Sequence, residues 1–223
     1  MLFEFRQTGK ELYSAEFWVV NENGDVLGTA SFKGNMVSVY GNWNISLLSM
    51  NISLERITAR RAVSLTGGLT KDKPFGAMEI LIDGVSRGVV FQGIHKKSLF
   101  KEYTVHHIVY DKQKMFCLYP IGFGADGSKS PVYLESAHEA VQIAQINKES
   151  IVRDDMHSFF CYVLEEKDVA TVVIFCALMY SMGCYHPGIK IIKGVKRTNS
   201  KTLEPELLSK YVPNFVLTIG KKM

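Results

Sequence analysis

The feature that most constrains this chain is a run of seventeen uncharged residues, VATVVIFCALMYSMGCY, from Val169 to Tyr185. The stretch EEKD (165–168) precedes it and suits a helix N-terminus, because carboxylates accept hydrogen bonds from free N–H groups and complement the helix dipole. We therefore expect a helix over 166–183. Such a helix is apolar on every face, so no face of it can be left in water.

Two environments accommodate a helix of this kind, a lipid bilayer and the interior of a protein. At 1.5 Å per residue the run is about 25 Å long, the short end of what spans a hydrocarbon core of about 30 Å. Thr171 and Ser181 also lower its hydrophobicity. The favoured interpretation is a core helix, and a single membrane span over 169–185 is the alternative.

Most of the first 165 residues are typical of short strands separated by turns. Ten Tyr and thirteen Phe favour strands, and Asn23-Gly24 and Asp83-Gly84 each predict a hairpin between two β-rich runs. A spacing of about ten residues between strands indicates a sandwich or barrel. SLERITARRAVSL (53–65) is either a helix or two short strands. Further strands are expected in MVSVYG, EYTVHHIVYD, MFCLYPIG, PVYLES, VQIAQINKE, SIVRDD and HSFFCYVLEE.

The stretch YPIGFGADGS (119–128) contains the pattern G-x-G-x-x-G at Gly122, Gly124 and Gly127. A dinucleotide site needs a strand before such glycines and a helix that opens directly after them. The residues that follow, SKSPVYLES, favour a strand instead. We therefore expect a loop between two strands, no helix at Ser128 and no nucleotide.

No other pattern predicts catalysis or metal binding. The four cysteines form no CxxC pair, and Cys184 with His186 is too sparse for a metal site. Adjacent residues of a strand point to opposite faces, so His106 and His107 cannot share one metal; we expect one buried and one surface histidine. Since the first residues do not resemble a signal peptide, we expect reduced thiols and a cytoplasmic location. Since no catalytic or metal-binding motif is present, we expect no catalytic residue, metal or cofactor.

Charge divides the chain unevenly. Residues 1–185 carry 18 basic and 20 acidic side chains, whereas residues 186–223 carry 8 and 2. A near-neutral body disfavours nucleic-acid binding. Lys190, Lys193, Lys196 and Arg197 lie within eight residues and predict contact with anionic lipid headgroups or an acidic protein surface, unless they form a solvated face.

Four stretches combine hairpins, further strands and the apolar run: FWVVNENGDVLGTASFKG, YTVHHIVYDKQKMFCLYPIG, VQIAQINKESIVRDDMHSFFCYVL and DVATVVIFCALMY. Together they resemble the tubby C-terminal-like superfamily, which includes tubby-like proteins, LURP-one-related proteins and phospholipid scramblases. The resemblance implies a mainly β fold, a closed antiparallel barrel of about twelve strands around a hydrophobic helix. It covers a single domain over 1–185, and the basic extension 186–223 is not required by the fold. No phosphoinositide-binding residue carries over, because no motif matches.

The expected function is that of a non-enzymatic binding or adaptor module at the periphery of a membrane. Its basic C-terminal segment would contact anionic phospholipid or an acidic protein surface. The alternatives are an integral membrane protein with one span and an enzyme without a recognisable motif.

Overall fold

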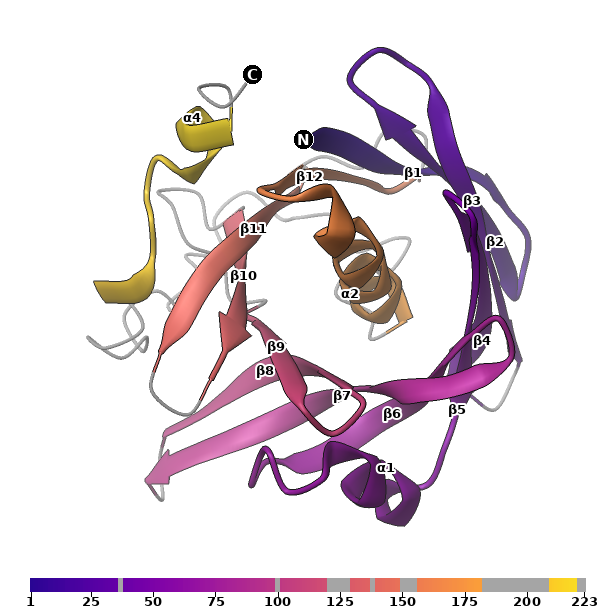
Figure 1. Cartoon of the computed structure of the whole chain (residues 1–223). Helices are drawn as coiled ribbons and strands as arrows, with labels where there is room; N and C mark the ends of the chain where they lie inside the picture. The colour runs from indigo at the N-terminus through magenta and orange to yellow at the C-terminus, as the bar shows by residue number, and fades with distance from the viewer. Residues whose placement is uncertain are drawn as a thin grey trace.

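The computed structural model describes residues 1–35, 38–98, 101–119, 129–136, 139–148, 156–181 and 209–219. Twelve antiparallel strands form a closed barrel in which each strand pairs with the next along the chain and β1 pairs with β12 (Figure 1). This confirms the predicted fold class. The strands are β1 Leu2–Lys10, β2 Ser14–Asn21, β3 Val26–Asn35, β4 Ser38–Leu47, β5 Met50–Arg56, β6 Lys73–Ile82, β7 Val85–Ser98, β8 Lys101–Tyr110, β9 Lys114–Leu118, β10 Lys129–Glu135, β11 Ala140–Lys148 and β12 Ser158–Val163.

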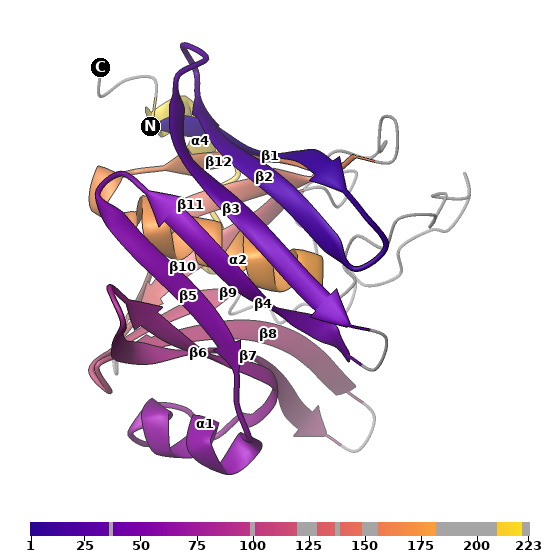
Figure 2. The same cartoon turned by 90° about the vertical axis from the view of Figure 1, so that its right-hand side faces the viewer.

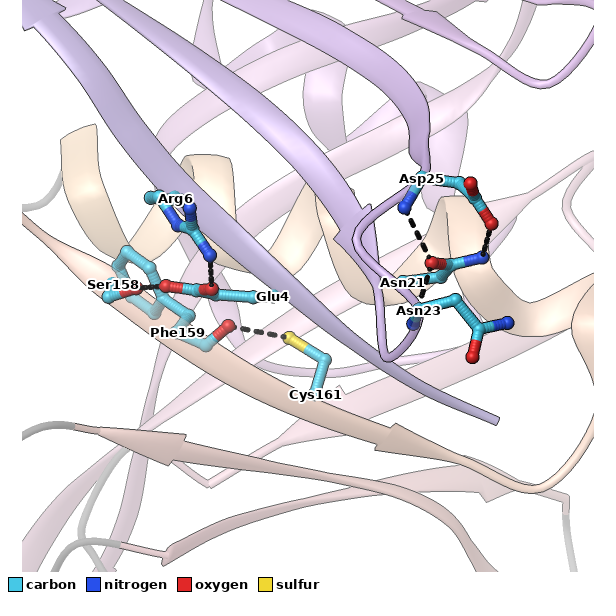
Figure 3. Close-up of polar contacts among 8 residues, drawn as sticks. All are labelled: Glu4, Arg6, Asn21, Asn23, Asp25, Ser158, Phe159 and Cys161. Atoms are coloured by element: carbon cyan, nitrogen blue, oxygen red, sulfur yellow. Dashed lines mark hydrogen bonds and ion pairs between the residues drawn. The ribbon is translucent and has the colours of Figure 1, made fainter.

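The barrel closes between its first and last strands. Their pairing runs from Leu2 opposite Tyr162 to Arg6 opposite Ser158. The carboxylate of Glu4 accepts hydrogen bonds from Arg6 and from Ser158, so one side chain of β1 is tied to β12 (Figure 3). β1 is absent from the strands predicted above, although its alternating burial is that of an ordinary half-buried strand.

The predicted hairpins are confirmed. Asp83 and Gly84 have φ angles of 51° and 78°, the pair of positive values that a two-residue type I′ turn requires. In the β2–β3 turn, Asn21 Oδ1 accepts the backbone N–H groups of Asn23 (3.0 Å) and Asp25 (2.8 Å) (Figure 3). The segment SIVRDD (150–155), predicted as a strand, lies outside the described residues.

The ambiguous segment 53–65 is half strand and half helix. β5 ends at Arg56, and α1 (Ala59–Thr66) begins after Thr58, whose hydroxyl accepts the backbone N–H of Arg61 at 3.2 Å. α1 lies outside the barrel against β6 and β7 (Figures 1 and 2). It covers a second, smaller apolar cluster on the outer face of the sheet, formed by Ala62, Ala77, Val89, Phe91 and Val109.

The apolar run is a helix inside the barrel. A short 3-10 turn, η1 (Glu166–Asp168), leads into α2 (Val169–Ser181), which runs through the barrel (Figure 2). Every residue from Thr171 to Met179 is buried. The interior of the barrel is therefore the environment of this helix. The last two residues of the helix expected over 166–183 lie outside the described ranges. None of the described helices is long and apolar enough to cross a membrane.

Aromatic side chains fill the barrel near the C-terminal end of α2. The rings of Phe5 and Phe17 stack at 4.6 Å, and Tyr180 contacts Phe17 edge-on at 5.0 Å. Trp43 donates its indole N–H to Ser181 Oγ at 2.7 Å, and that hydroxyl donates to the carbonyl of Ala177 at 3.0 Å. The hydrogen bond from Trp43 joins the end of the helix to β4.

The chain returns to the barrel near its C-terminus. α4 (Phe215–Ile219) packs outside β11 and β12 (Figure 1), and the backbone N–H of Val212 donates to Gln142 Oε1 at 2.9 Å. Part of the expected extension 186–223 therefore packs on the barrel.

Replacing Phe175 by Ala tests the packing of the central helix. Phe175 is fully buried, so Phe175→Ala removes a large apolar side chain and leaves a cavity, and we expect a loss of about 3–5 kcal/mol in unfolding free energy. The measurement is urea unfolding followed by fluorescence. Phe75→Ala is the matched control, because that side chain is 53% exposed; equal effects of the two substitutions would contradict the packing described.

Candidate functional site

Several residues singled out by the sequence lie outside the described ranges. Lys190, Lys193, Lys196 and Arg197 are among them, and so is the glycine stretch 120–128. The strands that flank this stretch, β9 and β10, pair antiparallel. β10 begins at Lys129, so the strand predicted after the glycines is confirmed.

The two ends of the barrel carry opposite charge. Each end comprises the three residues of every strand nearest to it and the described residues that connect those strands, except residues 57–70, which run along the outer face with α1. Ten acidic and four basic residues lie at the end where α2 begins, and five acidic and ten basic ones at the end where α2 finishes. We call these the acidic rim and the basic rim; their net charges are −6 and +5.

The acidic rim consists of the tight hairpin turns and the start of the central helix. Its acidic members are Glu4, Glu22, Asp25, Asp83, Asp111, Glu135, Glu139, Glu165, Glu166 and Asp168. The connection that carries α1 does not lie at the basic rim, because Arg61 pairs with Glu79 of β6 at 2.7 Å and a Cβ on Gly67 would lie 2.6 Å from Lys112 Cβ at the acidic rim. The basic members of the basic rim are Lys10, Lys33, Arg56, Lys71, Lys73, Lys96, Lys97, Lys101, Lys129 and Lys148.

Apolar side chains are exposed at the basic rim. Leu12, in the β1–β2 connection, is 83% exposed, and Phe75, near the start of β6, is 53% exposed. Phe75 borders a hollow of about 260 Å³ that Arg56 and Thr58 also line. Basic and apolar side chains on one surface are the combination that suits an anionic lipid interface.

The prediction for the histidine pair is half wrong. His106 and His107 do point to opposite faces of β8, but both are buried, with 1% and 4% exposure. His106 shares the inner face with Ile108, which belongs to the core around α2. His107 faces outward and is covered because this part of the sheet carries an outer layer of side chains, among them Phe91, whose ring stacks on the imidazole at 5.0 Å.

His107 is the centre of a cluster of polar side chains from three elements. Its Nε2 lies 2.8 Å from Asp72 Oδ2, in the connection before β6. Its Nδ1 lies 3.2 Å from Sγ of Cys117, directly opposite on β9. A carboxylate, an imidazole and a thiol therefore form one chain, which is the order of groups in a nucleophile–base–acid triad.

The thiol of this cluster is neutral at rest. Burial raises the pKa of Cys117 well above its ordinary value, and the carboxylates of Glu135 and Asp72 raise it further. Glu135 also accepts a hydrogen bond from the Tyr119 hydroxyl at 3.2 Å. Cys117 thus needs a base before it can act as a nucleophile.

A signal for half of this cluster was present in the sequence. His107 and Cys117 are equally far from Lys112, the middle of the turn that joins β8 to β9, so they are cross-strand neighbours in that hairpin. Asp72 comes from a connection thirty-five residues earlier, and local pattern does not place it.

Comparisons with protein-family models, with curated proteins and with solved structures find no match to this chain. The resemblance to the tubby C-terminal-like superfamily stays a prediction that the strand and helix pattern carries.

Gly93 is the position where the cluster tolerates no side chain. A Cβ on Gly93 would lie 2.8 Å from the imidazole of His107 and 2.9 Å from Asp72 Cβ. We expect Gly93→Ala to lower the unfolding free energy by about 1–3 kcal/mol, because His107 and Asp72 must separate. Gly9→Ala on β1 is the control, since its Cβ meets only Glu16 at 3.7 Å. Urea unfolding compares the two, and a Gly93→Ala protein as stable as the control would contradict the close packing.

Proposed function

We propose that this protein is a non-enzymatic binding module that contacts an anionic membrane surface through its basic rim. The observation that carries the proposal is the separation of charge between the rims, −6 at one end and +5 at the other. Such a distribution orients the molecule in the field of a negative surface, with the basic rim towards it. Each Lys or Arg near an anionic leaflet contributes about 1 kcal/mol.

The filled barrel supports a function at the outside. The helix and the aromatic side chains around it occupy the described interior, so a ligand of the described part binds at a rim or on the outer face. The exposed Leu12 and Phe75 at the basic rim add apolar area for contact with lipid.

The place where α2 ends supports adding the basic segment to this contact. The described helix ends at Ser181, at the basic rim, and the chain is described again from Ser209, with the backbone N–H of Val212 bonded to Gln142 of β11. Between these two points the sequence carries Lys190, Lys193, Lys196 and Arg197. We propose that these four side chains add to the contact, at the cytoplasmic face of a membrane.

Vesicle binding tests the proposal. We expect the full chain to sediment with vesicles of phosphatidylcholine and phosphatidylserine but not with phosphatidylcholine alone, and salt to weaken binding by screening. Neutralising Lys190, Lys193, Lys196 and Arg197 to Gln should weaken binding more than about tenfold, because each lost charge removes about 1 kcal/mol. A second variant neutralises Lys10, Lys33 and Lys73, and we expect a comparable loss.

The matched control neutralises two lysines of the acidic rim, Lys112→Gln and Lys167→Gln, and should bind as the unmodified chain does. Binding that ignores salt, or that falls equally in all three variants, would contradict the proposal. Binding to an acidic protein in place of vesicles would show that the rim recognises another kind of negative surface.

A further inference from the structure

We propose that Cys117 is a modification site for small disulfides, with His107 as the base that takes its proton and Asp72 as the residue that orients His107. The proposal is independent of the surface contact argued above, because it rests on the buried His107 and Cys117 on the outer face of β8 and β9 and not on the positive charge of the basic rim, although Asp72 lies at that rim.

The hydrogen bonds fix the proton on one nitrogen of the imidazole. A carboxylate only accepts, so Asp72 Oδ2 at 2.8 Å requires the proton on Nε2 of His107. The lone pair of Nδ1 then faces Sγ of Cys117 at 3.2 Å. This is the tautomer that a base needs, and the stacked ring of Phe91 holds its orientation.

The two other described cysteines lie in a different environment. Cys161 and Cys176 belong to the core inside the closed barrel, with their sulfur atoms 3.6 Å apart. Cys161 donates to the carbonyl of Phe159 at 3.6 Å (Figure 3). Cys117 lies in the outer layer beside Met115 and Glu135, which are only half-buried. Cys117 is itself only 1% exposed, so we expect a small probe to reach it when side chains of the outer layer move, whereas the barrel must open to expose the other two.

Disulfide exchange is the reaction that this cluster suits best. The sulfur attacks one sulfur of a small disulfide while Nδ1 of His107 takes the thiol proton; the old S–S bond breaks as the new one forms. The released thiolate takes the proton back from His107, so one thiol and one disulfide give one mixed disulfide and one thiol. Such a step develops no oxyanion on carbon and therefore needs no oxyanion hole, unlike acyl transfer.

The test uses the folded full chain with Cys184→Ser, because Cys184 lies outside the described residues. The probe is 2-hydroxyethyl disulfide, a small neutral disulfide, and peptide mass spectrometry follows each cysteine separately. We expect Cys117 to react at least about tenfold faster than Cys161 and Cys176. His107→Gln should slow Cys117 by at least about tenfold, because the base is lost. Asp72→Asn should also slow it, and Asp72→Glu should restore part of the rate.

A purely structural role for His107 predicts that its replacement raises the reaction rate of Cys117 and does not lower it. If His107 only packs the outer layer, its replacement loosens that layer and Cys117 reacts faster. Faster or unchanged reaction in His107→Gln would therefore overturn the proposal, and so would a Cys117 that reacts no faster than Cys161 and Cys176. If a variant unfolds, the reaction rates of Cys161 and Cys176 with the probe rise as well. In that case Asp72→Asn decides, with a slower Cys117 supporting the proposal and a faster or unchanged one overturning it.

Discussion

Burial of a helix that is apolar on all sides is the constraint on which the rest of this structure depends. Residues Thr171–Met179 cannot face water, and a barrel of twelve strands surrounds them on every side. Large inward side chains such as Phe5, Phe17 and Trp43 fill the space between helix and sheet. Because the described interior is filled in this way, chemistry and binding are left to the rims and the outer face.

The up-and-down order of the strands explains how charge separates. Successive connections alternate between the two ends, so acidic turns such as Asp83-Gly84 and basic residues such as Lys33 and Lys73 fall at opposite rims. Counted along the sequence, the same charges nearly cancel over residues 1–185. The polarity of the barrel becomes visible only when residues are grouped by strand end.

Patterns that depend on near neighbours were predictable, and those that depend on the outer layer were not. The uncharged run predicted a core helix, and Asp83-Gly84 predicted its hairpin from turn chemistry alone. β1 was missed because no turn motif marks its start, and residues 53–65 were ambiguous because the strand-to-helix change falls inside them. One of His106 and His107 was expected on the surface, since a strand pattern says nothing about a second layer of side chains such as Phe91 and Asp72.

Hydrogen–deuterium exchange of the α2 amides tests the central claim most directly. If the barrel encloses the helix, the amides of Val173–Leu178 exchange only through global unfolding, with the same opening free energy that urea unfolding measures. Exchange of these amides with a smaller opening free energy, while the strand amides stay protected, would contradict a helix held inside a closed barrel.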